Sequence, residues 1–568
     1  MIETKKSKWQ LLPSLKKGNG EGVEAVTRQL LFNRGLKDGE VDEFLNPEYE
    51  KLHDPYLFND MKKVVARIKK AVKNQEKVYI YGDYDIDGMT ASAQLYETIT
   101  AAGGLCEIYI PNRFDEGYGL NSEAVKRLTT EGAKLIITVD CGITGLAEVD
   151  LANEKGVDVI ITDHHILPSK LPKAYAILHP LRDGEKYPFR WLSGSGVAFK
   201  LACALHQEFR LPKGHEKWLL DLAALGTISD MVSLKGENRI IAQYGLLVLS
   251  KTRRPGLKAL YRQAGIEGKQ ISTYELGFVI GPRLNASGRL EHARKSLELL
   301  ITQDKAHAAN LAEELNNLNT QRQFLTQKIF GEAKEVIQNG PESPLLMVCG
   351  DGWNHGVVGI VASRLTNHFG KPAIVLGRKG DEIKGSARSV GEFNIVEALS
   401  ECKDCLVVYG GHQMAAGLTV KADQLEALRH KLYNIASSKQ KDLESVRPIE
   451  AELPIDLVGD ELWQALTKLG PHGVDNPLPI FVSDVMVLEI RAVGKDATHL
   501  KLRISNPQDQ SQYFEAIGFG LLPDYGDVHP GDIIKLIYSL DQNEWNGRVS
   551  LQLKVSDISN VKKPAQAI

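Results

Sequence analysis

The sequence predicts an α/β protein of several domains: a parallel-sheet domain, long connecting helices, a second, smaller α/β domain and a C-terminal β-barrel. Three observations predict this architecture. Short apolar strands alternate with helical sequence in the first half, a helix-rich stretch without proline follows, and strand-like runs crowd the chain after about residue 450. At 568 residues the chain is also too long for one core, because domains average roughly 150 residues.

Four runs rich in Val and Ile predict the strands of the parallel sheet. They begin at Lys77, Lys134, Val157 and Ala174, and each is continuously apolar and ends in a polar turn. Continuous apolar strands with helical sequence between them are typical of a sheet that helices cover on both faces. Ligands of such sheets bind at the carboxyl ends of the strands, so we expect the functional site there.

The composition of the remaining segments predicts their secondary structure. Residues 294–339 are rich in helix formers and lack proline, which predicts one or two long helices. Five strand-like runs between turns after Glu450 predict a small barrel, for which the OB-fold is the leading candidate. We therefore expect an N-terminal helical segment at residues 1–75, the catalytic α/β domain at 76–290 and connecting helices at 291–340. A substrate-binding α/β domain is expected at 341–445 and a nucleic-acid-binding barrel at 446–568.

Composition limits the function classes. The net charge is −3, so any surface that binds nucleic acid must be a local concentration of Lys and Arg. No run approaches the roughly 20 apolar residues that span a bilayer, and the first residues lack the apolar core of a secretory signal. Six cysteines in so long a chain predict no disulfide framework, so we expect a cytoplasmic protein without a membrane association.

Carboxylates and histidines follow the predicted strands. Asp83, Asp85 and Asp87 alternate after the first strand, Asp140 follows the second, Asp163, His164 and His165 follow the third, and Asp230 ends an apolar helix. Each group alone could be a solvated turn or a helix cap. Together they would repel one another unless cations neutralised them, and hard divalent cations prefer such oxygen ligands. The pattern therefore predicts a divalent-metal site.

The motifs GDYDIDG, VDCG, DHH and SDMV, in this order, resemble the four motifs of the DHH phosphoesterases. GPRLNASGRL, DGWNHGVVGIVASRL, GSARS, GGHQMAAG and GPHGVDNPLPIF, which lie between residues 281 and 481, are similar to motifs of the RecJ-type exonucleases within that family. The resemblance covers about residues 20–560. It implies an enzyme of DNA recombination and repair that releases mononucleotides from single-stranded DNA in the 5′-to-3′ direction, using two divalent cations, Mn²⁺ or Mg²⁺.

The resemblance also implies roles for individual residues. The expected metal ligands are Asp85, Asp87, Asp140, His164 and Asp230, and the expected catalytic groups around them are Asp83, Asp163 and His165. The expected substrate-binding residues are Arg113, Arg283, Ser386, Arg388 and His412. One position departs from the family. Many relatives have a histidine where this chain has Tyr81, a poor ligand. Either the first metal ion is therefore expected to bind more weakly, or Asp83 or water is expected to substitute there.

Two other functions stay open. A DHH phosphodiesterase for oligonucleotides or cyclic dinucleotides would generally be shorter and lack the barrel. A non-catalytic DNA-binding scaffold would have lost metal ligands, and here all five are present. The expected partners, by resemblance, are single-stranded DNA, the single-strand-binding protein and a RecQ-type helicase, and a monomer is expected. Cys402 with Cys405, and Gly194 with Gly196, are expected to be structural.

Overall fold

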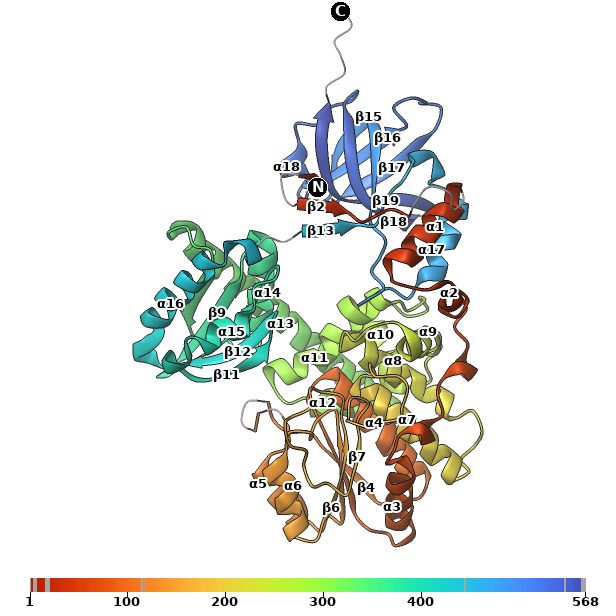
Figure 1. Cartoon of the computed structure of the whole chain (residues 1–568), viewed down its shortest axis with the longest axis vertical. Helices are drawn as coiled ribbons and strands as arrows, with labels where there is room; N and C mark the ends of the chain where they lie inside the picture. Colours follow the sequence, from red (N-terminus) through yellow and green to blue (C-terminus); the bar gives the residue numbers. More distant parts are fainter. Residues whose placement is uncertain are drawn as a thin grey trace, which may run out of the picture.

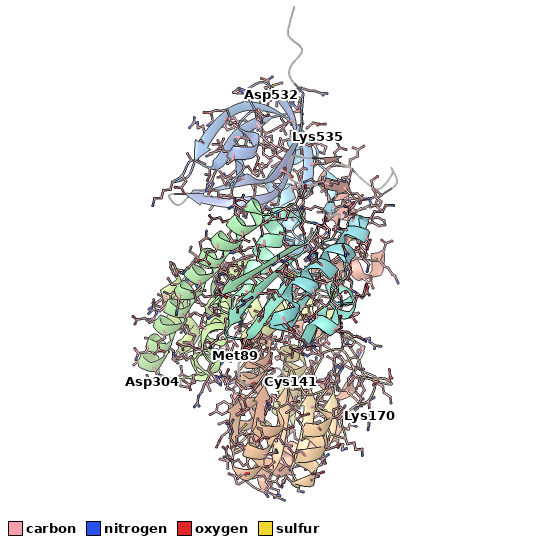
Figure 2. The ribbon with its side chains drawn as sticks, turned by 90° about the vertical axis from the view of Figure 1, so that its left-hand side faces the viewer. Met89, Cys141, Lys170, Asp304, Asp532 and Lys535 are labelled. Carbon is pink, nitrogen blue, oxygen red and sulfur yellow. The ribbon has the colours of Figure 1, made fainter. Side chains whose placement is uncertain are left out.

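The computed structural model describes residues 2–3, 8–15, 21–113, 116–117, 119–443, 446–545 and 548–562. Three bodies meet around a central group of helices (Figure 1): the parallel-sheet domain at the bottom, the second α/β domain at the left and the barrel at the top. In the perpendicular view of Figure 2, Met89 and Cys141 lie at the upper end of the parallel-sheet domain, which faces the other bodies. In this described part of the chain, no helix combines the length and apolarity needed to cross a bilayer.

The parallel sheet has the order β4-β3-β5-β6-β7. Its strands are β3 (Val78–Gly82), β4 (Cys106–Tyr109), β5 (Leu135–Val139), β6 (Asp158–Thr162) and β7 (Ala176–Leu178), and every pairing is parallel. The four predicted strands are confirmed. Strand β4 was not predicted, because it is a four-residue edge strand that includes Glu107 and is only partly buried.

Side-chain alternation along the strands separates the two faces of this sheet. Val78 and Ile80 pack with helices α3 (Met61–Lys73), α4 (Ile86–Ala101) and α7 (Gly194–Glu208). Tyr79 and Tyr81 point to the opposite face, which α5 (Ser122–Thr130) and α6 (Leu146–Glu154) cover. Both faces are therefore buried, as the continuous apolar runs predicted.

After the parallel sheet the chain continues through α8 (Leu220–Ser229), α9 (Gly236–Ser250), α10 (Pro255–Ala264), a π-helical turn (Glu275–Ile280) and α11 (Gly281–Leu290). The connecting helices α12 (Arg294–Ile301) and α13 (Lys305–Asn339) follow. Asp304 caps the start of helix α13, and its carboxylate accepts hydrogen bonds from the amides of Ala306 and His307. Leu311 near its start belongs to the core of the parallel-sheet domain, whereas Ile329 packs in the core of the second α/β domain. One continuous helix therefore connects the two domains.

The second α/β domain contains β8 (Leu346–Asp351), α14 (Val358–Phe369), β9 (Ala373–Lys379), β10 (Glu382–Arg388), α15 (Ile395–Ser400), β11 (Leu406–His412), β12 (Ala415–Val420) and α16 (Leu425–Ser438). Its sheet order is β11-β12-β10-β9-β8, with β8 and β9 parallel and the other pairs antiparallel. Cys402 and Cys405 are buried in its core as free thiols, in agreement with the structural role expected for them.

The C-terminal body is the predicted five-stranded barrel. Its elements are β14 (Ala451–Glu452), α17 (Asp460–Leu469), β15 (Phe481–Val493), β16 (His499–Ser505), β17 (Tyr513–Gly518), α18 (Leu522–Tyr525), β18 (Ile533–Trp545) and β19 (Arg548–Lys562). The barrel closes because β15 pairs with both β16 and β18, while β19 joins β17 to β18.

The N-terminal segment divides between two bodies. Strand β2 (Lys8–Leu11) pairs with β1 (Ile2–Glu3) and with β13 (Val446–Ile449), and helices α1 (Gly22–Asn33) and α2 (Asp38–Leu45) pack into the barrel core. Helix α3 instead covers the parallel sheet. Arg239 on α9 fastens the junction, since its guanidinium donates hydrogen bonds to the carbonyls of Phe44, Lys468, Leu469 and Gly470.

Candidate active site

The acidic site forms at the carboxyl ends of β3, β5 and β6. Asp85 caps helix α4, and its carboxylate accepts a hydrogen bond 3.1 Å long from the amide of Gly88. Asp87 lies in the first turn of α4, where its two oxygens accept hydrogen bonds from the amides of Gly194, at 2.7 Å, and Ser195, at 2.9 Å. The Gly-Ser-Gly sequence does begin helix α7, as expected, and its amides also fix a metal-ligand candidate, which the sequence reasoning missed.

Two glycines allow α7 and α8 to approach the acidic loops. A Cβ atom on Gly194 would lie 2.5 Å from Oδ1 of Asp140, and one on Gly226 would lie 2.5 Å from Oδ1 of Asp87. Neither distance is compatible with a side chain. The close packing of these helices therefore requires glycine at both positions.

The turn after β5 positions Asp140. This residue has a positive φ of 60°, and its amide donates a hydrogen bond to the carbonyl of Thr162. Its Oδ1 lies 3.1 Å from Nε2 of His164, which also faces Oδ2 of Asp230 at 3.6 Å and Oδ2 of Asp87 at 3.9 Å. Three carboxylates from separate segments thus surround one imidazole nitrogen.

The ligand atoms fall into three overlapping groups, and within each group they lie no more than 4.8 Å apart. The groups are Asp83 with Asp85 and Asp140, Asp87 with His164 and Asp230, and Asp140 with His164 and His165. Oxygen and nitrogen ligands within this spacing can share one divalent cation. Because the first two groups have no member in common and Asp140 adjoins both, the arrangement fits two neighbouring cations.

The electrostatics of the cluster support cation binding. Burial first, and then the neighbouring carboxylates, raise the pKa of Asp140 and Asp83 well above the usual range. The same causes raise the pKa of Asp87 to about 7 and that of Asp230 to about 9. Oδ1 of Asp83 is buried, yet among the described residues it accepts no hydrogen bond. Buried, mutually repelling carboxylates with spare lone pairs are what a hard cation stabilises.

His164 and His165 differ in charge. Burial lowers the pKa of His164 to about 3, and the neighbouring His165 adds to this effect, so the ring is the neutral imidazole that a metal needs. Burial opposes a charge on His165, but the hydrogen bond from its Nδ1 to Oδ1 of Asp163, 2.8 Å long, raises its pKa to about 9. His165 is thus the cationic member of the pair.

Asp163 is directed into its own loop rather than into the metal-ligand groups. Its oxygens accept hydrogen bonds from the amides of Ile143 and His164 and from the ring of His165. Burial alone would raise the pKa of Asp163, but the bond and the charge of His165 lower it to about 2. Asp163 therefore orients His165, and it supplies no atom to the three groups.

Tyr81 turns away from the site. Its buried hydroxyl donates a hydrogen bond 3.1 Å long to the carbonyl of Gly119, and its ring packs against Tyr109 on the opposite face of the sheet. It belongs to none of the metal-ligand groups, whereas Asp83 does.

A cluster of arginines lies between the acidic site and the second α/β domain. A Cβ atom on Gly359, at the start of α14, would lie 3.1 Å from both Oγ of Ser386 and Nη2 of Arg388, so these two side chains share one small space. Burial lowers the pKa of Arg388, and the positive charge of Arg113 lowers it further.

Arg289 connects this cluster to the acidic loops. Its pKa is lowered to about 10, mainly by burial and then by the positive charges of Arg113, Arg322 and Arg388. The negative charge of Asp85 acts in the opposite direction and raises this pKa. Its Nη1 donates to the carbonyl of Gly356. Arg322 was missed in the sequence, because the pattern of α13 indicated only a connecting helix.

The other two predicted substrate contacts, Arg283 and His412, lie on α11 and β11. Arg283 donates from Nη1 to the carbonyl of Val279 and from Nε to Oδ1 of Asn316 on α13. His412 is exposed at the end of β11, an edge strand. His412 on β11 and Arg388 on β10 both pair with Ala415 of β12, which lies between them, so His412 is two strands away from Arg388. Its role as a substrate contact stays a prediction.

The raised pKa values predict a pH dependence of stability in the absence of divalent cations. Folded Asp230 and His165 hold protons up to about pH 9, whereas their ordinary pKa values are 3.8 and 6.5. Because the folded state binds more protons between pH 6.5 and 9, the free energy of unfolding falls as pH rises through this window. We expect the melting temperature in EDTA to fall over this range, and to fall less steeply for Asp230→Asn. A melting temperature that rises with pH would contradict the assignment.

Comparison with known proteins agrees with this organisation. Residues 77–227 match the DHH family N-terminal domain, 342–438 the DHHA1 domain and 449–557 the RecJ OB domain. The fold and its acidic strand ends thus define a DHH phosphoesterase.

Individual relatives show to which branch of this family the chain belongs. The chain is 41% identical to the single-stranded-DNA-specific exonuclease RecJ of Bacillus subtilis, over 94% of this chain and 68% of the relative. It is 34% identical to RecJ of Escherichia coli, over 94% and 95% of the two chains. The crystal structure of RecJ from Thermus thermophilus with Mn²⁺ superposes with a TM-score of 0.83 at 29% identity, covering 99% of this chain and 80% of that one. The chain belongs to the RecJ family of single-stranded-DNA-specific exonucleases.

Proposed function

We propose that this protein is a single-stranded-DNA-specific exonuclease that removes mononucleotides in the 5′-to-3′ direction during DNA recombination and repair. The observation that carries the proposal is the convergence of carboxylates and a neutral imidazole on one cluster, beside a group of arginines to which both α/β domains contribute. Relatives named as exonucleases of this kind match nearly the whole chain.

The proposed metal ligands are Asp85, Asp87, Asp140, His164 and Asp230, with Asp83 completing the first group. The spacing of these ligands, and the raised pKa values of Asp87, Asp140 and Asp230, fit two divalent cations. Mn²⁺ or Mg²⁺ is proposed, since RecJ of Thermus thermophilus has been solved in complex with each. Bound cations supply positive charge that activates water and stabilises the leaving oxygen in phosphodiester hydrolysis. The protein contributes the fixed geometry of the carboxylates, and Asp163 orients His165, whose positive charge can contact a phosphate.

The proposed substrate contacts begin at Ser386 and Arg388, which share one small space and can hold a terminal 5′-phosphate. Arg113 and Arg283 are proposed to contact internal phosphates, and His412 to contact the strand at the rim of the second domain. The barrel is proposed to bind the strand further from the cut, where basic side chains and exposed aromatics such as Tyr513 are available.

The proposed domain boundaries are those expected from the sequence, except that residues 1–75 divide between the barrel and the parallel-sheet domain. The proposed partners beyond DNA are the single-strand-binding protein and a RecQ-type helicase, which would supply and expose the substrate of a monomeric enzyme. Because that substrate is DNA, we place its action in the cytoplasm.

One assay separates this function from its alternatives. End-labelled single-stranded DNA, duplex DNA, RNA and a dinucleotide are incubated with the protein, with and without Mn²⁺. We expect mononucleotides from single-stranded DNA only when the metal is added. Preference for the dinucleotide would favour an oligonucleotide phosphodiesterase, and binding without hydrolysis would favour a scaffold.

Binding should depend on salt even though the chain carries a net charge of −3. Each phosphate that an arginine neutralises releases condensed counterions, with a slope of about −0.7 per contact for single strands. We expect the logarithm of the binding constant to fall linearly with the logarithm of salt concentration, measured by fluorescence anisotropy in EDTA. A flat plot would remove nucleic acid as the principal ligand.

A further inference from the structure

Two of the most exposed large apolar side chains in the described structure belong to segments next to the metal-ligand groups. Trp191 is 61% exposed and Met231 is 71% exposed. Met231 directly follows Asp230, and it has a positive φ of 59°. Trp191 stands three residues before Gly194, whose amide binds Asp87, so its Cα lies within about 11 Å of that amide. Both side chains therefore offer open apolar surface to a ligand that binds at this site.

A single buried amide holds the two loops together. Nδ2 of Asn238, which is fully buried, donates hydrogen bonds to the carbonyl of Trp191 at 2.5 Å and to the carbonyl of Ser233 at 3.0 Å. Ser233 is two residues beyond Met231. The backbone of both loops is therefore fixed, while the indole and the thioether remain open to solvent.

From this we infer that Trp191 stacks on a base next to the scissile phosphodiester, with Met231 available on the neighbouring loop. The inference rests on the proposed function. A nucleotide whose phosphate lies at the carboxylates must place its base within a few bond lengths of the sugar, and carboxylate groups cannot stack on it. The indole face offers that surface, and a stacked aromatic ring accepts any base, because every base has a π-face.

Stacking of a base on Trp191 would position the strand more precisely than contacts with phosphate alone. Charged contacts hold the backbone but allow it to slide, whereas a stacked base fixes which phosphodiester lies at the acidic groups. Trp191 is thus a substrate-positioning residue. Its loss should lower the rate of cleavage without altering cation binding.

The test compares enzyme variants on substrates with and without bases. The substrates are a 5′-phosphorylated single strand and the same strand with tetrahydrofuran abasic residues at its first two positions. We expect Trp191→Ala to lower kcat/KM on the normal strand by about 10-fold, within the range of base–aromatic stacking. On the abasic strand it should match the wild type, and Trp191→Phe should restore most of the activity. Phe32→Ala, at an exposed aromatic on α1, is the matched control.

A second readout needs neither metal nor turnover. Strands with 2-aminopurine at the first or the second position are titrated with protein in EDTA, and stacking quenches their fluorescence. We expect quenching at one of these positions with the wild type and with Phe32→Ala, but not with Trp191→Ala. Equal losses of Trp191→Ala on normal and abasic strands, or unchanged quenching, would overturn the inference. Failure of the wild type to cut any single strand would instead refute the proposed function.

Discussion

Asp140→Asn should abolish nearly all exonuclease turnover, lowering kcat by on the order of 10³-fold or more, while leaving the affinity for single-stranded DNA within about twofold. Asp140 adjoins both cation groups, so its loss affects both ions at once. Asparagine is chosen because the residue has a φ of 60°, a conformation that asparagine adopts more readily than alanine. Rates are measured with saturating Mn²⁺, and affinity is measured in EDTA.

The same variant should be more stable than the wild type when no metal is present. Replacing one carboxylate removes repulsion among buried groups whose pKa values are raised. Mn²⁺ should then raise the melting temperature of the wild type more than that of Asp140→Asn, because a ligand stabilises a fold in proportion to its affinity. Asp150→Asn, at an exposed position on α6, is the control. Substantial Mn²⁺-dependent turnover by Asp140→Asn would refute the two-cation assignment.

The acidic cluster could be predicted from the sequence because parallel strands place their carboxyl ends at one edge. Asp83, Asp140 and His164 follow strands whose apolar runs are unambiguous, so topology alone brings them together. The barrel was predictable for a similar reason, since its five strands are separated by evident turns.

The contacts that were missed join segments far apart in the chain. The amide of Gly194 binds Asp87 across 107 positions, and the indole of Trp9 donates to Asp557 across 548 positions. Neither contact leaves a periodic signal, because each depends on how whole helices or bodies pack. Arg322 was missed for the same reason: on a helix read as a connector, an arginine that faces a site resembles one that faces solvent.

Arg388→Ala should slow the degradation of a 5′-phosphorylated strand far more than that of a 5′-hydroxyl strand. Arg388 and Ser386 both lie against Gly359 at the start of α14, on the domain that faces the acidic site across Arg289 and Arg113. A terminal phosphate monoester carries more negative charge than an internal diester, and a hydroxyl beside a guanidinium can bind its additional oxygen. A charge-assisted contact of about 1.5–3 kcal/mol corresponds to roughly a 10- to 150-fold difference in kcat/KM between the two substrates.

The control is Arg378→Ala, which removes an exposed arginine on the neighbouring strand β9 that pairs only loosely with Asp351. Strands labelled at the 3′ end and at the 5′ end are compared to establish the direction of degradation. If Arg388 anchors the terminus, the anchor holds the first scissile bond near the cation groups, and its loss lowers the rate although those groups are intact. Equal losses on both substrates would remove Arg388 from the phosphate site, and release of the first labelled mononucleotide from the 3′ end would reverse the proposed polarity.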